Sequence, residues 1–246
     1  MEIKPKKAMI FAAGLGTRLG SATRDMPKAL VEINGYPLLE IVLRKLEKFA
    51  YTDVVINVHH FADKIIDFAA HYKGNINLHI SDESSQLLDT GGGLFKASHF
   101  FGDEPFLLHN CDVMSNIDID RMLSQHLDNK AIATLAVRDR FTSRYFLFSK
   151  DYILSGWKNF TTGQEIITRQ QDEYIPMAFS GIHMINPKIF QLYKAEKPKF
   201  STTEMYLELS KKHEIKAYVD IADYWSDVGK PDDLKEAEKY FHKFFV

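Results

Sequence analysis

The sequence is poor in three features that would each point to a particular class of protein. Its 246 residues include one cysteine, Cys111, which excludes an internal disulfide framework and a cysteine-rich zinc site. It has no long apolar run, since residues 8–13 are too few for a signal peptide or a membrane span. The net charge is −2, so no general field favours nucleic acid or an anionic membrane. We therefore expect a cytoplasmic protein with small-molecule partners, in which any phosphate site is local.

Short apolar runs alternate with helical patterns over the first part of the chain. The runs predict buried strands at residues 9–12, 53–58, 76–80, 105–109 and 131–137. Helices are expected between them, at residues 38–49, 60–72, 93–101 and 117–127. Strands that alternate with helices in this way predict an α/β fold with a mostly parallel sheet.

The rhythm changes after residue 137. Residues 144–168 contain short strand-like pieces separated by turns, which predicts a β-rich insertion. A buried strand at residues 177–185 and a terminal helix from Pro231 to about residue 244 follow. Because there is neither a repeat nor a linker, we expect a single domain over residues 1–246.

The first strand runs into the stretch "AAGLGTRLGSATRDMPKAL". Glycines between a strand and a helix let the backbone approach a phosphate and direct N–H groups at it. The spacing of Gly14, Gly16 and Gly20 differs from G-x-G-x-x-G, and no G-x-x-x-x-G-K-[ST] is present, so neither a dinucleotide fingerprint nor a P-loop is indicated. Arg18 and Lys28 add two cations, which favours a polyphosphate ligand over a purely structural tight turn.

Two aspartates far apart in the sequence, Asp112 and Asp227, each follow a strand-like piece. The carboxyl ends of strands gather ligand sites in α/β sheets, and two carboxylates together with phosphate oxygens suit Mg²⁺. The alternative is that each aspartate caps a helix. The adjacent His59 and His60 are not expected to bind a metal, because neighbouring strand residues point to opposite faces.

These stretches resemble a known family. "AAGLGTRL…PKAL" resembles the signature loop of the sugar-1-phosphate nucleotidyltransferases, A-A-G-x-G-x-R…P-K-P. "LLDTGGGLFKA", "FLLHNCDV", "FSGIHMINPKIF" and "YWSDVGKPDDL" resemble further motifs of the family, in the expected order. The glycine-bearing segment is most similar to the form in N-acetylmuramate-1-phosphate uridylyltransferases, and mannose- or heptose-1-phosphate guanylyltransferases are nearly as similar.

The resemblance implies a fold, a reaction and a cofactor. The fold is a Rossmann-like three-layer α/β/α nucleotidyltransferase fold with a mainly parallel mixed sheet and a small β-rich insertion. Its nucleotide-binding half covers about residues 1–137 and its sugar-phosphate-binding half about residues 138–246. The implied reaction joins an NTP, UTP or GTP above all, to a sugar 1-phosphate with release of pyrophosphate, and uses Mg²⁺. Nucleotide-sugar synthesis for a cell-envelope polysaccharide is the implied setting.

The resemblance also assigns residues. Arg18 and Lys28 are the implied catalytic cations, and Asp112 and Asp227 the implied metal ligands. Nucleotide contacts are implied for Ala12, Ala13, Gly14, Gly16, Thr17, Gly91 and Gly92. Sugar-phosphate contacts are implied for Asn110, Lys158, Ser180 and Gly181. Arg144 is a rival of Lys158 for the sugar phosphate, and an exposed lysine with no role is equally consistent.

The chain departs from the family pattern at several positions. Gly20 stands where many relatives carry a second basic residue, Ala29 replaces the proline after the lysine, and Cys111 replaces the glycine before the metal aspartate. Two other functions stay open: a cytidylyltransferase for phosphocholine or another alcohol phosphate, and a non-catalytic nucleotide-binding regulator. The sequence leaves a monomer and a homodimer equally open.

Overall fold

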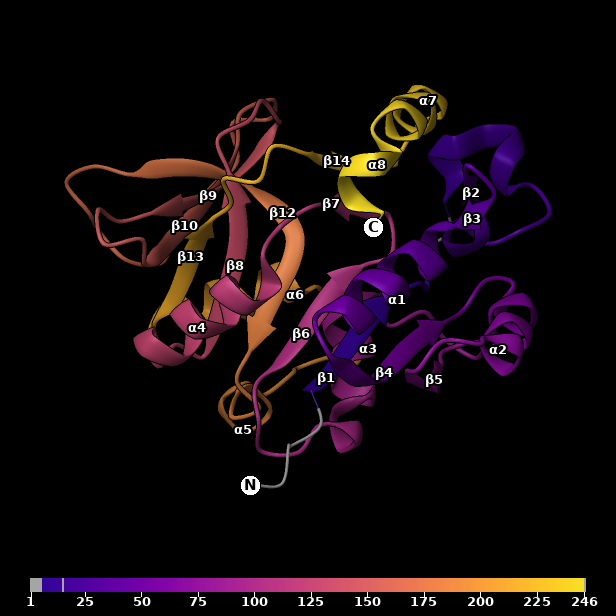
Figure 1. Ribbon diagram of the computed structural model, residues 1–246. Helices are drawn as coiled ribbons and strands as arrows, with labels where there is room; N and C mark the ends of the chain where they lie inside the picture. Colours follow the sequence, from indigo (N-terminus) through magenta and orange to yellow (C-terminus); the bar gives the residue numbers. More distant parts are fainter. Residues whose placement is uncertain (1–5, 15, 246) are drawn as a thin grey trace. The chain divides into compact units, whose positions relative to one another are not determined.

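The computed structural model describes residues 6–14 and 16–245, and the chain packs as two compact units (Figure 1). The first unit comprises Met1–Leu87, Leu108–Ile117 and Ala222–Val246, and the second comprises Leu88–Leu107 and Asp118–Ile221. Each unit is therefore assembled from segments that are distant in the sequence. The division into a nucleotide half and a sugar-phosphate half near residue 137 concerns ligands, and it stays a prediction.

The first unit is built on strands in the order β6-β1-β4-β5, to which β6 contributes its residues from Leu108 onward. β1 pairs in parallel with β4, and β4 pairs in parallel with β5. Two small antiparallel pairs, β2 with β3 and β7 with β14, complete its strands. The bounds are β1 Lys6–Phe11, β2 Glu32–Ile33, β3 Tyr36–Pro37, β4 Tyr51–Val58, β5 Asn77–Asp82, β6 Phe106–Asn110, β7 Val113–Ser115 and β14 Trp225–Asp227.

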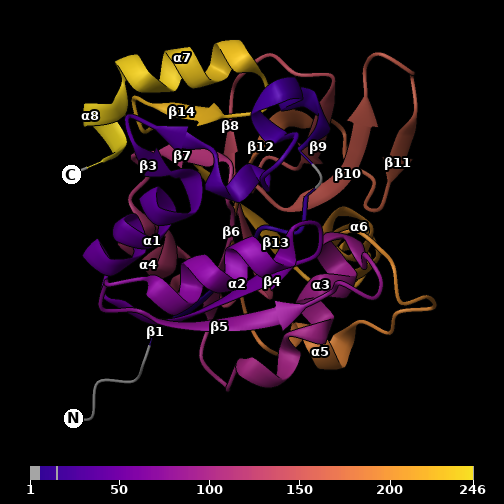
Figure 2. The ribbon, with the colours of Figure 1, turned by 90° about the vertical axis from the view of Figure 1, so that its right-hand side faces the viewer.

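The helix that follows β3 buries an apolar face. In α1, Leu38–Lys48, the buried side chains recur every three or four residues, as expected for an amphipathic helix packed on a sheet. α2, Ala62–His71, lies along β5 (Figure 2). Two C-terminal helices follow β14: α7, Pro231–Lys239, and α8, Phe241–Phe244. Pro231 stands at the start of α7, where its missing N–H costs no helical hydrogen bond.

The second unit is a mixed sheet with helices. Its strands pair in the order β11-β10-β9-β12, and β8 lies between β12 and β13. All of these pairs are antiparallel except β8 with β13. The bounds are α3 Asp89–Lys96, α4 Ile119–Asn129, β8 Ala133–Arg138, β9 Arg144–Phe148, β10 Leu154–Asn159, β11 Glu165–Ile167, β12 Ile175–Ile185, α5 Ile189–Leu192, α6 Thr202–Ser210 and β13 Ile215–Val219.

The structure confirms the predicted α/β class, the parallel pairs at the sheet's core and the β-rich region after residue 137. One predicted element begins in the wrong place. The helix expected to follow the glycine run instead begins at Asp89 and contains Gly91, Gly92 and Gly93. Among the described residues, no helix combines the length and apolarity that a membrane crossing needs.

Candidate active site

The first loop leaves β1 with its backbone already anchored. The amide of Ala12 donates to Asn57 Oδ1 at 2.8 Å, and Asn57 Nδ2 donates to Glu83 Oε1 at 2.7 Å. Asn57 and Glu83 are both buried. Sequence reasoning missed this pair, since neither residue belongs to a recognised motif. Its effect is to fix the direction of the loop; the N–H of Ala12 is used within the protein, and Ala13 beside it is buried.

Beyond Ala13 the loop opens and then closes against Lys28. Gly14 is exposed, and a Cβ placed on it would meet no atom within 4 Å. At Gly16 the backbone has φ +66°, and a Cβ there would lie 2.9 Å from Lys28 Cβ and 3.1 Å from Thr23 Cγ2. Thr23 Oγ1 donates to the carbonyl of Gly16 at 3.0 Å. Only glycine combines this conformation with so close an approach, so the loop backbone can pass this near the base of the Lys28 side chain only with glycine at position 16. The predicted nucleotide contact Thr17 is exposed and begins a 3-10 helix, Thr17–Thr23.

Lys28 reaches the first of the two predicted metal ligands. Its Nζ contacts Asp112 Oδ2 as an ion pair, although 84 residues separate them. Asp112 follows β6, and the amide of its neighbour Cys111 donates to the carbonyl of Phe11 at 3.2 Å, so the end of β6 lies beside the end of β1. The pair is sheltered: Lys28 is 8% exposed, and 22% of the Asp112 side chain is exposed. Charges sheltered in this way are screened by salt less than surface charges are.

Asp227 lies on the strand that faces Asp112. In the β7–β14 ladder Asp227 is opposite Val113, and the amide of Val228 donates to the carbonyl of Asp112 at 2.8 Å. The two aspartates, 115 positions apart in the sequence, thus come together at one end of this ladder, where Asp227 ends β14 and Asp112 immediately precedes Val113. The helix-cap alternative does not account for either residue, because Asp112 and Asp227 lie at strand ends.

Arg18 lies against the turn that follows Asp227. A Cβ placed on Gly229 would lie 3.4 Å from Cζ, Nη1 and Nη2 of Arg18 alike. Equal distances to three atoms of a planar group mean that the guanidinium lies flat on Gly229. The turn itself is held by Asp233, whose Oδ2 accepts from the amides of Gly229 at 3.0 Å and Lys230 at 2.6 Å. The W-S-D-V-G motif therefore supplies a surface for Arg18 as well as a carboxylate.

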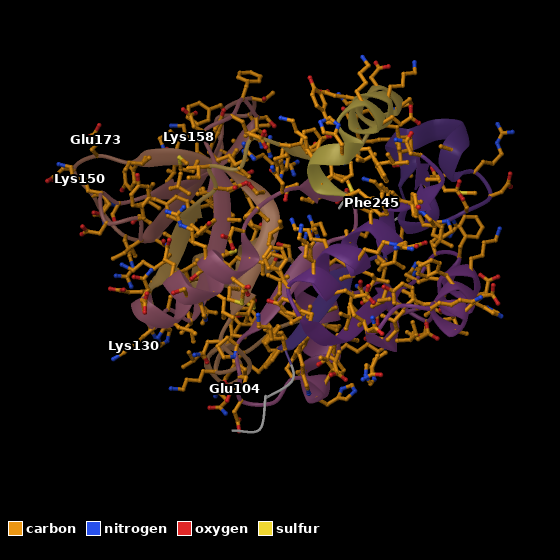
Figure 3. The ribbon with its side chains drawn as sticks, viewed as in Figure 1. Glu104, Lys130, Lys150, Lys158, Glu173 and Phe245 are labelled. Carbon is orange, nitrogen blue, oxygen red and sulfur yellow. The ribbon has the colours of Figure 1, made fainter. Side chains whose placement is uncertain are left out.

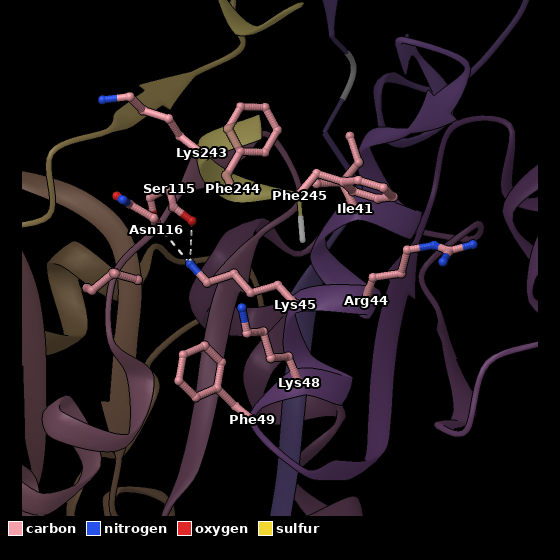
Figure 4. Close-up of a pocket in the computed structure, with 11 residues that line it drawn as sticks. Ile41, Arg44, Lys45, Lys48, Phe49, Ser115, Asn116, Lys243, Phe244 and Phe245 are labelled. Carbon is pink, nitrogen blue, oxygen red and sulfur yellow. Dashed lines mark hydrogen bonds between the residues drawn. The ribbon is translucent and has the colours of Figure 1, made fainter. Parts of the chain in front are cut away.

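A lysine of α1 holds β7, the strand that follows Asp112, through hydrogen bonds. Lys45 Nζ, on α1, donates to the carbonyl oxygen of Ser115 at 2.7 Å and to Ser115 Oγ at 3.1 Å (Figure 4). Lys45 lines a cavity of about 90 Å³, while the Arg44 and Lys243 side chains at its rim extend away from Lys45. Because Ser115 ends β7, this contact ties the ladder that carries both aspartates to α1.

The donor set at the ladder fits a divalent cation. Mg²⁺ in proteins takes one or two carboxylates and completes its shell with water and substrate phosphates. Asp112 and Asp227 offer two carboxylates, both with exposed surface. Among residues 6–14 and 16–245, no group of three or more His, Cys, Asp or Glu side chains is placed to hold a metal by itself. A metal at Asp112 and Asp227 thus depends on ligands from outside the protein.

Two titratable groups beside Asp112 are unsuited to chemistry. Burial, with Asp112 as a second cause, raises the pKa of the Cys111 thiol to about 12, so the nucleophilic thiolate is not formed near neutral pH. Burial lowers the pKa of His109 to about 3, and its Nδ1 donates to the carbonyl of Asn110 at 2.8 Å. Cys111, which replaces the family's glycine, therefore occupies space without adding a reactive group.

The other predicted nucleotide contacts lie in the second unit. Gly91 and Gly92 are buried in α3, and both of their amides donate to the carbonyl of Phe200, at 2.9 and 3.1 Å. A Cβ on Gly91 would lie 2.4 Å from the Phe200 ring, and one on Gly92 would lie 2.2 Å from the carbonyl oxygen of Pro198. These glycines have a packing reason to be glycine, and their contact with a nucleotide stays a prediction.

The predicted sugar-phosphate contacts divide between the units. Asn110 ends β6 in the first unit. In the second, Ser180 is buried and Gly181 has φ +76°, within a break in the register of β12 against β8 that spans Phe179 to His183. Such bulges re-aim side chains and are frequent next to active sites.

Lys158 stands on β10 with partners of its own (Figure 3). Its Nζ lies 2.8 Å from Glu165 Oε1 across the β10–β11 pair and 5.4 Å from the centre of the Phe160 ring. Its rival, Arg144, is exposed at the start of β9. A role for either in binding the sugar phosphate stays a prediction.

Comparison with known proteins assigns the family. The family model described as nucleotidyl transferase matches residues 7–243. The chain belongs to the nucleotidyl transferase family. It is 31% identical over 201 residues to the N-acetylmuramate alpha-1-phosphate uridylyltransferase of Caulobacter vibrioides, with 77% of this chain and 78% of the relative covered.

Two further relatives align with a larger share of this chain. It is 27% identical to the D-glycero-alpha-D-manno-heptose 1-phosphate guanylyltransferase of Aneurinibacillus thermoaerophilus, over 95% of this chain and 97% of the relative. The crystal structure of HddC from Yersinia pseudotuberculosis, complexed with GMP-PN, matches with a TM-score of 0.76 and 25% identity, over 96% of this chain and 99% of that one. The chain is thus a nucleotidyltransferase similar to enzymes that act on sugar 1-phosphates.

Proposed function

We propose that this enzyme transfers a nucleotidyl group from an NTP, UTP or GTP, to a sugar 1-phosphate. One observation carries the proposal: two cations of the first loop each reach one of two acidic motifs from elsewhere in the chain. Lys28 contacts Asp112, and Arg18 lies on Gly229, two residues after Asp227. The uridylyl and guanylyl relatives support these two bases and a sugar 1-phosphate acceptor.

The reaction needs charge neutralisation more than it needs a nucleophile from the protein. A sugar 1-phosphate is already an anionic nucleophile, and its obstacle is repulsion by the triphosphate. Attack of a phosphate oxygen on the α-phosphorus forms the new P–O bond and releases pyrophosphate. Lys28 offsets charge at the α-phosphate, and Arg18 holds the β- and γ-phosphates and the departing pyrophosphate. No general base is required, which agrees with the raised pKa of Cys111 and the lowered pKa of His109.

Asp112 and Asp227 are the residues that would hold Mg²⁺ in this proposal. When bound, the ion would supply positive charge that offsets the charge of the reacting phosphates, and the two carboxylates would be its protein ligands. Gly14 and Gly16 let the loop backbone approach the nucleotide. Asn110, Ser180 and Gly181 are proposed to contact the sugar.

The test is release of pyrophosphate from a matrix of four NTPs against several sugar 1-phosphates and phosphocholine, with Mg²⁺ and with EDTA. We expect release with UTP or GTP and one sugar 1-phosphate, and none with EDTA. The Asp112→Asn variant, folded by circular dichroism, is the matched control and should be inactive. If pyrophosphate is released only with phosphocholine, the acceptor is phosphocholine and not a sugar 1-phosphate. If no substrate pair releases pyrophosphate although the protein still binds nucleotide, the proposed catalysis is contradicted.

A further inference from the structure

The ion pair between Lys28 and Asp112 raises a question of charge. Asp112 is proposed to ligate a divalent cation, yet its carboxylate already contacts an ammonium group. A cation and an ammonium within a few ångströms of one carboxylate repel each other, and the sheltered position of the pair weakens screening by water. The two positive charges therefore compete for Asp112.

The base of the Lys28 side chain lies close to Gly16, and three methylenes separate Cβ from the ammonium. A Cβ placed on Gly16 would lie 2.9 Å from Lys28 Cβ, and the Lys28 backbone stands in a turn in which the amide of Val31 donates to the Lys28 carbonyl at 3.1 Å. Pro27 before it limits the backbone further, because its ring fixes φ. The three methylenes beyond Cβ keep their rotatable bonds. Rotation about these bonds would move the ammonium away from Asp112 without a change in the loop backbone.

We propose that Lys28 is an exchangeable counter-ion of Asp112. A metal ion must displace the Lys28 ammonium before the Asp112 carboxylate can ligate that metal ion. This inference rests on the proposed function for the identity of the metal site. An arriving phosphate offers the displaced ammonium a new partner. Anything that draws Lys28 away from Asp112 therefore favours metal binding, and by linkage the metal favours phosphate binding to Lys28 to the same extent. Lys28 thus makes the binding of metal and nucleotide cooperative and weakens the binding of metal in the absence of nucleotide.

Arg18 provides a charge-matched control within the same loop. It carries the same charge as Lys28, but its guanidinium lies on Gly229, and no hydrogen bond or ion pair joins it to Asp112. Removal of Arg18 changes the general field at the ladder, whereas removal of Lys28 also frees the Asp112 carboxylate. A comparison of the two separates competition for one carboxylate from a change in net charge.

The experiment titrates the whole protein with Mn²⁺ alone at pH 7.5 and low salt, by calorimetry and by the electron paramagnetic resonance signal of free Mn²⁺. We expect the Lys28→Met variant to bind Mn²⁺ on the order of tenfold more tightly than the wild type, about 1.4 kcal/mol, while losing activity. Lys28→Arg, which keeps the charge, should not tighten binding. Arg18→Met should tighten it about twofold or less, as expected for partly screened charges that share no carboxylate.

The double variant Lys28→Met with Asp112→Asn decides whether the effect acts through the carboxylate. It should bind Mn²⁺ no more tightly than Asp112→Asn alone. Equal affinity of wild type and Lys28→Met, or a gain that persists without the Asp112 carboxylate, would overturn the proposal. If Lys28→Met does not fold, Lys28→Gln makes the same charge change with a polar group. If the wild type releases no pyrophosphate, only the proposed reaction is refuted, since the Mn²⁺ titration does not depend on turnover.

Discussion

Three glycines of the first loop form a graded test of why the loop is built from glycine. Gly14 has no positive φ and open space around its Cβ position. Gly20 has φ +59° and ψ −119° with the same open space, and Gly16 has φ +66° with Lys28 Cβ at 2.9 Å and Thr23 Cγ2 at 3.1 Å. Alanine should therefore introduce no penalty at Gly14 and a conformational penalty at Gly20. At Gly16 it should introduce both a conformational and a steric penalty.

The magnitudes follow from the geometry. For Gly14→Ala we expect a change in unfolding free energy of about 0.5 kcal/mol or less. For Gly20→Ala we expect a loss of about 1–3 kcal/mol, since an L-residue rarely adopts its backbone angles. For Gly16→Ala we expect a left-handed penalty of about 1–2 kcal/mol and a further 1–3 kcal/mol, roughly, for overpacking against the base of Lys28. The base of a side chain cannot swing aside as its tip can.

The free energy of unfolding of the three variants is measured by urea titration monitored by circular dichroism. The rate of pyrophosphate release gives kcat and shows how displacement of Lys28 affects turnover. We expect stability to fall in the order Gly14→Ala, Gly20→Ala, Gly16→Ala, with the largest loss of kcat for Gly16→Ala. A Gly16→Ala protein as stable as the Gly14→Ala protein would refute the role assigned to Gly16. Equal kcat for Gly16→Ala and Gly20→Ala would refute the link between Gly16 and Lys28.

Three further expectations concern other parts of the chain. Asp112→Asn and Asp227→Asn should each lower kcat about a hundredfold or more at nearly unchanged melting temperature; retained activity in either would remove that residue from the metal site. Gly91→Ala should lower the unfolding free energy by about 1–3 kcal/mol through overpacking, because its Cβ would lie 2.4 Å from an aromatic ring, and an unchanged urea midpoint would contradict that packing. Burial lowers the pKa of His109 to about 3 and that of His126 to about 4, so the unfolded chain binds more protons below pH 6.5 and stability falls as the pH drops from 6.5 towards these values. Between pH 7 and 5 each histidine should cost about 2 kcal/mol, measured by urea midpoints, and His109→Asn should remove about half of the slope.

The fold was predictable where local pattern and tertiary structure agree. The alternation of apolar runs and amphipathic helices over the first 137 residues is sufficient for an α/β class, because each buried strand and each helix face leaves its own period in the sequence. The start of α3 was not predictable in this way. Glycine normally disfavours a helix, and only contact with Phe200 and Pro198, about a hundred residues later, gives Gly91 and Gly92 a reason to be inside one.

Residues for the candidate site can be chosen from the sequence, but their contacts cannot, and their roles stay predictions. Arg18, Lys28, Asp112 and Asp227 could be chosen because their types suit a triphosphate and because their motifs resemble a family. That Lys28 contacts Asp112 and that Arg18 lies on Gly229 depends on strand pairing over long sequence separations, which no local pattern encodes.

The four charges of the candidate site explain why it can be both folded and reactive. Two cations and two carboxylates cancel, so the protein holds no excess of like charge at the ladder. In the proposed reaction the same four groups would face different partners, with the cations on phosphates and the carboxylates on a metal. A rigid ion pair would stabilise the fold and oppose this exchange, and a fully mobile lysine would be poorly positioned for either task. Gly16 lets the loop backbone pass close to the base of Lys28, and the methylenes beyond Cβ would let the ammonium exchange partners as we propose. In the proposed reaction, Gly16 would therefore serve both the approach of the backbone to the nucleotide and the placement of the Lys28 charge.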